Sequence, residues 1–515
     1  MDRLPSLSAE AASAKRPSMT TEPVRPEARS PRGFVDRRPR DLAAERRILA
    51  AVSAVYERYG FEPLDTGAFE YADALGKFLP DADRPNEGVF ALQDDPDSEG
   101  NGQWMALRYD LTAPLARFAA QNWETLPKPF RRYAYGPVWR NEKPGPGRFR
   151  EFWQCDADTV GSARPEADAE IIAMAAEGLV AAGLPQGSAV LKINNRKLLD
   201  GLFDAHGVED VRQRLTALRA IDKFDRLGWP GVRDLLGPGR LDESGDFTKG
   251  AELAPAAIGA IQSFLAIEAA PDLSRLEVVE ALATLTLGAK GEEALAELQK
   301  ITAALAGMGV AEAAARIDTT VVRGLEYYTG AVFEAELLLQ TADEKGNPVR
   351  FGSIGGGGRY DDLVARFTGQ QAPATGFSFG VSRLASALRA AGRDLGAQAR
   401  GPVVVIAFDQ SRMSDYFAVA RELRAAGVAA EVYLGSSGMK AQMKYADRRL
   451  SPAAVIIGED ELAAGTVTIK DLDLGRALSA GVTDNAAWRE QRPGQVTAPR
   501  ADLVPIIRKI LDARP

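Results

Sequence analysis

The first clear pattern of apolar positions along the chain is helical. Over residues 41–59, large apolar side chains recur every three or four positions, which predicts an amphipathic helix that ends at Gly60. Residues 61–69 are typical of a strand. Residues 1–30 carry almost no large apolar groups and are rich in Pro, Ser, Ala and Arg, so we expect a disordered tail there.

A hairpin is predicted over residues 132–160. Residues 132–141 alternate and are rich in aromatic and β-branched types, 143–147 hold prolines and glycines, and 149–160 alternate again. In one register, a single face carries Arg140, Arg150, Gln154 and Asp158, with Glu142 and Arg148 beside the loop. Because guanidinium groups bind phosphate oxygens bidentately, this face suits a ligand with phosphate and ammonium groups. A solvated hairpin whose charges pair with one another would explain the pattern equally well.

Asp110 and Thr112 follow a predicted strand over 104–109, which comes after a polar turn over 94–102. If the strand continues, both side chains point the same way and can accept hydrogen bonds from one ammonium group. A cap at the start of a helix over 113–121 would explain both residues as well. The sequence leaves both interpretations open.

In the middle of the chain, the pattern of apolar residues changes from mixed helix and strand to helical, and then back to strand. A helix over 166–183 and a strand over 189–194 are followed, from 197 to 309, by Ala, Leu, Glu and Arg at helical spacing. We therefore predict a helical insertion over 197–309 that divides one core domain into 31–196 and 310–398. Strand signals return over 316–336 and 347–354.

Three stretches of the second core part carry candidate chemistry. Residues 322–330 place Arg323, Tyr327 and Tyr328 on a turn that enters a strand. The glycine run 355–358 allows a close backbone approach to a ligand, although a crowded central strand would need the same residues. Residues 375–384 run from strand into helix, with Arg383 near the amide groups that favour anions.

Strand and helix alternate after Arg400. Strands are predicted over 402–408, 428–433, 453–457 and 467–471, and helices over 414–426, 439–448 and 502–512. This alternation predicts a separate α/β domain over 401–515 with a mostly parallel sheet. A local basic face there contains Lys440, Lys444, Arg448 and Arg449. Such a face is either solvated or a contact for nucleic acid.

The amino-acid composition excludes several classes of functional site. The 515-residue chain has a net charge of −8, one cysteine and one histidine. Cys155 excludes a disulfide framework and is expected to be a packed apolar residue, while His206 alone excludes imidazole triads and HExxH zinc sites. No apolar run approaches the roughly 18–20 residues that cross a bilayer, and we expect a cytoplasmic protein. The net charge disfavours general attraction to nucleic acid but permits a local basic patch.

These stretches together resemble the histidyl-tRNA synthetases, a family of class II aminoacyl-tRNA synthetases. Residues 138–142 and 147–152 resemble motif 2, and 380–384 resemble motif 3. Residues 323–330 and 356–363 resemble two signatures peculiar to the family. The resemblance implies an α+β fold, with a class II catalytic core of antiparallel sheet and flanking helices, a helical insertion and a C-terminal α/β anticodon-binding domain.

The resemblance also implies a reaction and a site. Histidine would be activated by ATP to histidyl-adenylate and transferred to the 3′ end of tRNA(His), releasing AMP and pyrophosphate. Catalysis would rest on Arg140 and Arg323, which face the charge on the α-phosphate. The implied histidine-binding residues are Asp110, Thr112, Arg140, Gln154, Asp158, Arg323, Tyr327 and Tyr328. The implied ATP-binding residues are Arg140, Glu142, Arg148, Phe152 and Arg383. Mg²⁺ would accompany ATP without a metal site in the protein, and a homodimer is expected.

More detailed roles follow from the same resemblance. The α-ammonium of histidine would be bound by Asp110, Thr112 and Gln154. The imidazole nitrogens would contact Asp158 and Tyr328. Glu142 would read the adenine amino group and Phe152 would stack on the ring, while Arg148 and Arg383 would hold the β- and γ-phosphates.

Two other functions compete with this one. A regulatory paralogue would keep the class II core and bind histidine without charging tRNA, but such proteins generally lack the anticodon-binding domain and the arginine–tyrosine signature. A non-catalytic RNA-binding module would not need a full adenylate pocket. Histidine-dependent exchange of pyrophosphate into ATP separates the three functions.

Overall fold

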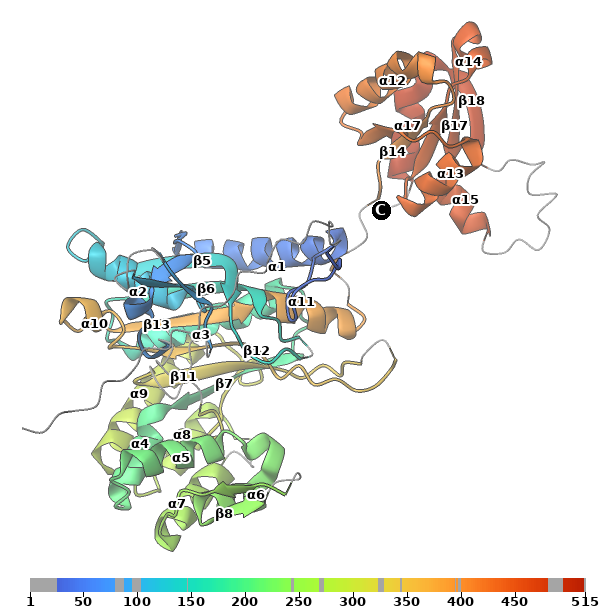
Figure 1. Ribbon diagram of the computed structural model, residues 1–515. Helices are drawn as coiled ribbons and strands as arrows, with labels where there is room; N and C mark the ends of the chain where they lie inside the picture. The colour runs from blue at the N-terminus through green and yellow to red at the C-terminus, as the bar shows by residue number, and fades with distance from the viewer. Residues whose placement is uncertain are drawn as a thin grey trace, which may run out of the picture. The chain divides into compact units, whose positions relative to one another are not determined.

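The protein divides into two compact units, each described here by itself (Figure 1). One unit spans Met1–Arg38 and Ala44–Leu395, and the other spans Pro39–Ala43 and Gly396–Pro515. The computed structural model describes residues 26–78, 88–94, 103–145, 147–241, 245–267, 273–322, 328–342, 345–393, 395–396, 400–479 and 494–513. Most of the expected tail, residues 1–25, lies outside these ranges.

The first unit is built on an eight-stranded sheet. Its order is β1 (Glu62–Pro63), β5 (Phe130–Trp139), β6 (Glu151–Val160), β13 (Ala374–Gly380), β12 (Ser353–Arg359), β11 (Ala331–Leu337), β7 (Ala189–Asn195) and β10 (Ala315–Ile317). The edge strands β1 and β10 pair in parallel, and the inner strands pair antiparallel. The predicted hairpin is confirmed as β5 and β6, which pair from Phe130 with Val160 to Trp139 with Glu151.

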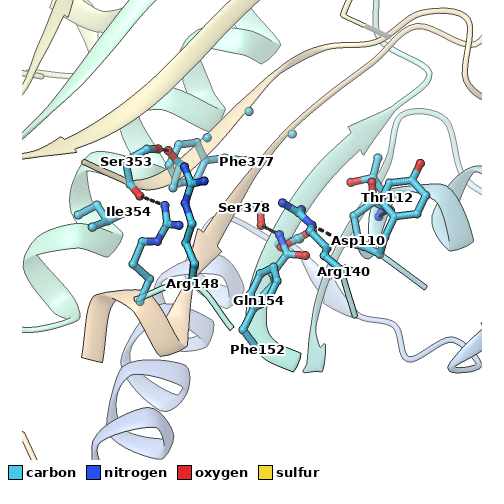
Figure 2. A pocket seen from close by; sticks show the side chains of 18 of the residues that line it. Asp110, Thr112, Arg140, Arg148, Phe152, Gln154, Ser353, Ile354, Phe377 and Ser378 are labelled. Carbon is cyan, nitrogen blue, oxygen red and sulfur yellow. Dashed lines mark hydrogen bonds between the residues drawn. The ribbon is translucent and has the colours of Figure 1, made fainter. Parts of the chain in front are cut away.

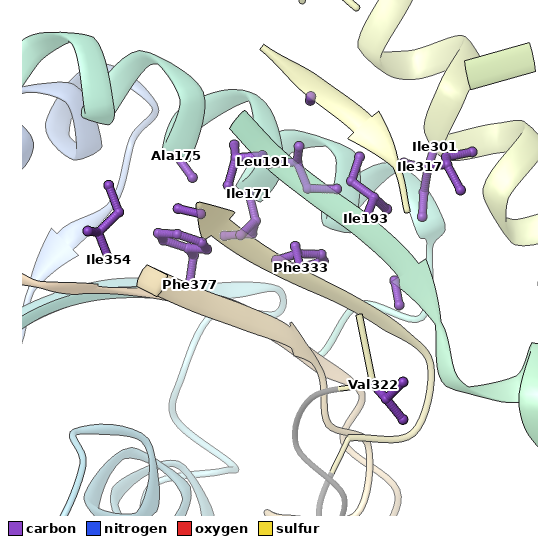
Figure 3. Close-up of a cluster of buried hydrophobic side chains, with 14 of the residues drawn as sticks. Ile171, Ala175, Leu191, Ile193, Ile301, Ile317, Val322, Phe333, Ile354 and Phe377 are labelled. Atoms are coloured by element: carbon purple, nitrogen blue, oxygen red, sulfur yellow. The ribbon is translucent and has the colours of Figure 1, made fainter. Parts of the chain in front are cut away.

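Three helices supply apolar side chains to the core on one face of this sheet: α1 (Pro39–Arg58), α3 (Pro165–Ala181) and α11 (Val381–Ala390). Figure 3 shows Ile171 and Ala175 of α3 beside Phe333 and Phe377 of the sheet. The predicted helices over 41–59 and 166–183 are therefore confirmed. Side chains alternate along a strand, so Cys155 and Ala157 of β6 join this core while their even-numbered neighbours face the other way.

Helices dominate the segment between β7 and β10, as predicted: α4 (Arg196–Ala205), α5 (Val211–Ile221), α6 (Phe224–Leu236), α7 (Pro255–Ala266), α8 (Arg275–Leu282) and α9 (Gly288–Gly307). Two short strands that the sequence did not predict, β8 (Gly239–Leu241) and β9 (Phe247–Lys249), pair within it. Leu198 and Leu298 of these helices share one buried cluster with Ile193 of β7. The helical segment therefore continues the core of the sheet.

Several predicted strands are wrong in extent. The strand over 61–69 is replaced by β1 and by β2 (Phe69–Tyr71), which forms a small sheet with β4 (Trp104–Leu107) and β3 (Ala91–Gln93) in the order β2-β4-β3.

The strand over 347–354 is shifted, because β12 begins at Ser353 and contains the glycine run. A Cβ on Gly357 would lie 2.0 Å from the Gly376 carbonyl oxygen of β13. The glycines thus form a crowded central strand. The predicted turn over 94–102 lies mostly outside the described residues.

The remaining elements of this unit are short or connect others. They are η1 (Ala72–Phe78), α2 (Thr112–Gln121) and α10 (Ala365–Thr368). Leu115, Ala116 and Ala119 of α2 pack with Phe130 and Val160 in a second, smaller apolar cluster. This packing fixes the start of α2 near the end of β6 that carries Asp158.

The second unit has a five-stranded sheet in the order β15 (Ala430–Val432), β14 (Val403–Ile406), β16 (Ala453–Ile456), β17 (Thr466–Asp471) and β18 (Gln495–Pro499). Its helices are η2 (Gln410–Arg412), α12 (Met413–Ala425), α13 (Met439–Arg448), α14 (Glu459–Ala464), α15 (Leu472–Ser479), η3 (Arg500–Asp502) and α17 (Leu503–Asp512). The expectation of a mostly parallel sheet is wrong, since β17 and β18 pair antiparallel. The link 457–465 is too short for a parallel crossover, which needs about a dozen residues or more. Within the described ranges, no helix is long and apolar enough to cross a membrane.

Candidate active site

A pocket of about 420 Å³ opens on the face of the large sheet opposite α1 and α3. Figure 2 shows side chains from separate segments converging on it, with Arg148 beside Ser353 and Ile354 and with Arg140 beside Asp110 and Thr112. The sequence-predicted residues that line it are Asp110, Thr112, Arg140, Glu142, Arg148, Phe152, Gln154, Asp158, Tyr328 and Arg383. Arg323 and Tyr327 lie outside the described residues.

The floor of the pocket is β6. Its even-numbered residues face the pocket, and among them the Gln154 amide nitrogen donates to the Ser378 hydroxyl of β13 at 2.5 Å. Arg150 does not line the pocket, although the predicted alternation included it, because β6 begins at Glu151. The Arg150 Nε instead donates to the Glu142 carbonyl at 3.2 Å.

The start of α2 forms one wall. The Asp110 Oδ1 accepts hydrogen bonds from the backbone N–H groups of Thr112, at 3.2 Å, and Ala113, at 2.9 Å. Asp110 therefore caps the first N–H groups of α2, although the N-cap position is Leu111 and Thr112 is the first residue of the helix. A continuing strand is wrong because β4 ends at Leu107. Burial raises the pKa of Asp110, while the bonds from Ala113 and Thr112 oppose the rise. Both Asp110 and Thr112 still line the pocket.

Two arginines of the pocket are held by backbone carbonyls. Arg140 Nε donates to the Tyr109 carbonyl at 3.0 Å, and its guanidinium lies 5.1 Å from the centre of the Phe152 ring. Arg383, in the first turn of α11, donates from Nη1 to the Ser353 carbonyl at 2.8 Å. A guanidinium carries five N–H donors and a permanent positive charge, so each of these arginines is suited to an anionic ligand in the pocket. The arrangement suits an extended ligand with negative charge at two places.

Acidic groups gather at another part of the pocket, around Asp158. Its Oδ2 lies 2.9 Å from Arg132 Nη2, and its Oδ1 accepts a short hydrogen bond from the Tyr360 hydroxyl. Arg132 also donates to the Leu111 carbonyl at 2.8 Å, which ties this cluster to the start of α2. Burial raises the pKa of Asp158, and the positive charge of Arg132 lowers it. This end of the pocket is built to meet hydrogen-bond donors and positive charge.

Sequence reasoning missed three residues of this cluster: Arg132, Asp156 and Tyr360. Asp156 has the same parity on β6 as Gln154 and Asp158, so the alternation alone could have found it. Arg132 faces Asp158 directly across the β5–β6 pair, which the register of the hairpin would have shown. Tyr360 follows the glycine run of β12, and no local signal indicates that its hydroxyl reaches Asp158.

Cys155 and His206, the single cysteine and histidine of the chain, lie away from the pocket. Cys155 is buried in the core under α1, as predicted, and burial raises the pKa of its thiol. His206 follows α4, where its Nδ1 lies 2.9 Å from the Leu202 carbonyl, and it does not line the pocket. Among the described residues, no group of three or more His, Cys, Asp or Glu side chains could hold a metal ion.

Comparison with known proteins identifies relatives over most of the chain. Residues 33–384 match the family model described as "Histidyl-tRNA synthetase", and residues 402–488 match the one described as "Anticodon binding domain". A histidine–tRNA ligase of Caulobacter vibrioides is 72% identical over 95% of this chain and 97% of its own. A histidine–tRNA ligase of Brucella ovis is 54% identical over 95% of this chain and 96% of its own.

A solved structure agrees with these relatives. The crystal structure of histidyl-tRNA synthetase from Nostoc sp. PCC 7120 is 29% identical in sequence to this chain and superposes with a TM-score of 0.67. The match covers 94% of this chain and 100% of the other. The predicted α+β architecture with an end domain is therefore confirmed.

Proposed function

Since the chain belongs to the histidyl-tRNA synthetase family and ligates histidine to tRNA, we propose that its adenylation site is the pocket over β6. The single observation that carries the proposal is the convergence of Arg140, Arg148 and Arg383 with the acidic cluster in one pocket. ATP is a substrate throughout the family. Its phosphates need fixed cations, and histidine needs acceptors for its ammonium and ring N–H groups.

Histidine binds at the acidic end of the pocket. Asp110, Thr112 and Gln154 are close to the region expected to hold the α-ammonium, and Asp158 and Tyr328 are close to that of the imidazole. Tyr327 and Arg323 join them by family resemblance. Buried acceptors that must be satisfied by a ligand discriminate strongly, because each unmatched group costs about 1–3 kcal/mol.

ATP binds toward the loop of the hairpin. Arg148 and Arg383 support the β- and γ-phosphates, Phe152 offers a ring for the adenine and Glu142 an acceptor for its amino group. Arg140 lies over the Phe152 ring and near Asp110, between the two substrates. This position suits a residue that must touch both the histidine carboxylate and the α-phosphate.

The chemistry follows from these positions. The histidine carboxylate is already an anion at neutral pH and attacks the α-phosphorus, so this step needs no base. A bond forms between a carboxylate oxygen and phosphorus, and the bond to the leaving pyrophosphate breaks. Arg140, together with Arg323, stabilises the negative charge on the transferring group. In the second step, the terminal ribose hydroxyl of tRNA attacks the acyl carbon, AMP leaves, and a phosphate oxygen accepts the proton.

Mg²⁺ accompanies ATP in this proposal. An ion of this kind is held mainly by substrate phosphates and water, with few ligands from the protein. Such an ion neutralises phosphate charge. The protein's own contribution is the set of arginines that fixes the phosphates in place.

The proposal extends to assembly and location. Exposed apolar side chains gather on and beside the small β2-β4-β3 sheet, where Phe69, Tyr71, Leu92 and Trp104 are each more than two-fifths exposed. Apolar clusters of this kind mark protein interfaces, and a second copy of the chain is the partner that fits the family. We place the homodimer in the cytoplasm, where its tRNA substrate is charged.

The regulatory alternative is less well supported. Residues 402–488 match an anticodon-binding domain, which such proteins generally lack, and Arg140, Arg148 and Arg383 all line the pocket. A protein that only bound histidine would not need Arg148 and Arg383 beside the hairpin loop.

Histidine-dependent pyrophosphate exchange into ATP tests the proposal. The wild-type protein should support exchange, and Arg140→Ala should slow it at least about a hundredfold, the usual effect of removing a contact to transition-state charge. Arg131→Ala is the matched control, because Arg131 is a neighbouring hairpin arginine that pairs with Glu170 at 3.0 Å, outside the pocket. A folded wild-type protein without exchange would refute the assignment of this pocket.

A further inference from the structure

Asp156 occupies the middle of the pocket floor and has no assigned role. It lies between Gln154 and Asp158 on the pocket face of β6 and is 1% exposed. Within the described part of the chain, neither of its carboxylate oxygens has a hydrogen-bond partner. The Ser378 hydroxyl is near enough to lower its pKa but accepts from Gln154 and lies outside hydrogen-bond geometry with Asp156. Buried polar groups of folded proteins are nearly always paired, so this exception calls for a partner.

The other two buried carboxylates of the pocket, Asp110 and Asp158, already have protein partners. Asp158 is held by Arg132 and by the Tyr360 hydroxyl. Asp110 accepts two backbone hydrogen bonds at the start of α2. Among the buried carboxylates of the pocket, Asp156 is therefore the one whose two oxygens both remain available to a ligand.

Charge balance indicates what that ligand group is. Arg132 is 1% exposed and pairs with Asp158, and no described lysine or arginine forms an ion pair with Asp156. A buried carboxylate without a counter-ion is costly, and a bound cation removes that cost. In histidine near neutral pH, the α-ammonium carries a full charge, whereas the imidazole, with a usual pKa near 6.5, is mostly neutral.

We propose that the Asp156 carboxylate accepts a hydrogen bond from the α-ammonium of bound histidine and is a specificity-determining contact of the pocket. The inference rests on the proposed function, because it requires histidine to bind over β6. Gln154, the next pocket-facing residue of the same strand, lies beside this contact. Arg132 then acts as a positioning residue. Its positive charge neutralises the Asp158 carboxylate, so that the Asp156 carboxylate is available to bind the substrate.

Three ligands measured on two variants test the contact. Histidine and histidinol carry the amine, and imidazolepropionate lacks it. Asp156→Asn should weaken binding of the first two by about 10- to 100-fold, the range for a hydrogen bond to a charged group, and change imidazolepropionate less than about threefold. Asp168→Asn is the control, since Asp168 is equally buried at 1% exposure but pairs with Arg359 outside the pocket. It should affect all three ligands alike.

The outcomes separate this inference from the proposed function. If all three ligands weaken equally in Asp156→Asn, the carboxylate contacts the imidazole or acts only structurally, and the inference is wrong. Unchanged binding also overturns it. Absence of histidine-dependent exchange in the wild-type protein would instead refute the site itself.

Proton release by the wild-type protein tests the contact without a substitution. Burial raises the pKa of Asp156 to about 8 against the opposing charge of Arg132. The titratable groups that interact electrostatically with it are Arg132, Asp158, Asp110, Arg108, Tyr56 and Cys155. Tyr56 and Cys155 lie in the core on the other face of β6. The free carboxyl is thus mostly protonated at pH 7 and loses its proton when an ammonium binds. Calorimetry in buffers of different ionisation enthalpy should show more proton release with histidinol than with imidazolepropionate, and equal release would overturn the inference.

Discussion

Arg132 shows how one side chain can support a pocket without lining it. Its guanidinium is buried, contacts Asp158 and the Leu111 carbonyl, and lies close enough to lower the pKa of Asp156. Two further nitrogens, Nε and Nη1, have no hydrogen-bond partner within the described residues. The cluster of Arg132, Asp156 and Asp158 is therefore incompletely satisfied without ligand. Such clusters are typical of binding sites, where the ligand completes the network.

Replacing Arg132 should be costly to the fold. Arg132→Leu leaves Asp158 buried without its counter-ion, and we expect the free energy of unfolding to fall by about 3–5 kcal/mol, as for other broken buried pairs. The adjacent Arg131 is the control, because its side chain is 36% exposed and its ion pair with Glu170 is partly solvated. Arg131→Leu should cost at most about 1 kcal/mol. Denaturant unfolding at neutral pH measures both, and similar losses would contradict the role of Arg132.

The site residues differ in how far the sequence could reveal them. Alternation along β6 identified Gln154 and Asp158, because a strand repeats every two residues and the hairpin signal was strong. The same alternation includes Asp156, although it was not singled out. Arg132 lies on the neighbouring strand, and its contact with Asp158 follows from the register of the hairpin and not from parity alone. The link from Tyr360 to Asp158 spans 202 positions and follows from sheet order, which no local pattern specifies.

At the scale of elements, β12 can lie between its two neighbouring strands because its central residues are glycines. It lies between β11 and β13, and Cβ atoms on Gly357 and Gly358 would meet backbone oxygens at 2.0 and 2.7 Å. Gly355, Gly356 and Gly357 of β12 also line the pocket, where the absence of side chains leaves room for a ligand. The glycines are therefore required by the packing of the neighbouring strands, and they also leave space for the substrate.

A single methyl group should disturb this strand. Gly357→Ala brings the new Cβ against the Gly376 carbonyl, and strands β12 and β13 must separate, so we expect destabilisation of at least about 1–3 kcal/mol and loss of pyrophosphate exchange. Gly259→Ala in α7 is the control, because nothing lies within 4 Å of its Cβ position. It should stabilise the protein by up to about 1 kcal/mol. Thermal unfolding and exchange rates test the pair, and a fully active Gly357→Ala protein would contradict this account.

Element length decided how well the sequence predicted the fold. The long helices α1 and α3 and the long hairpin of β5 and β6 were predicted because each repeats its period several times. Strands of two or three residues, such as β1, β2 and β8, repeat no period, and tertiary contacts alone define them. The shift of the strand predicted over 347–354 has another cause, because glycines carry no hydrophobic signal at all.

At the scale of the whole molecule, the two units have separate cores. The first contains a large apolar cluster around the eight-stranded sheet, and the second packs both faces of its own sheet, with Val403 and Val405 on one side and Val404 and Ile406 on the other. The change in sequence pattern near Arg400 predicted this division, because alternating short strands and helices replace long hairpins. It could not predict the antiparallel pairs β16–β17 and β17–β18, because the alternation of strands and helices does not state in which direction neighbouring strands pair.

The basic face of α13 belongs to the whole-molecule function, since it lies in the unit that matches an anticodon-binding domain. Lys440, Lys444, Arg448 and Arg449 are all exposed, but Arg449 pairs with Glu431 at 3.0 Å. Lys440, Lys444 and Arg448 are therefore the better candidates for contacts with tRNA phosphates. The sequence predicted the face but not the ion pair of Arg449, which requires β15 to lie beside the end of the helix.

Reversing charge on this face should separate the two steps of the reaction. In the full chain, Lys440→Glu with Lys444→Glu should raise the KM for tRNA and flatten its dependence on salt by about one unit of slope per lost phosphate contact. Histidine-dependent pyrophosphate exchange should not change, because adenylate formation uses the other unit. Lys249→Glu, on an exposed strand of the helical segment, controls for net charge and should alter neither. If the double variant lost exchange and charging together while remaining folded, α13 would not be a dedicated tRNA contact.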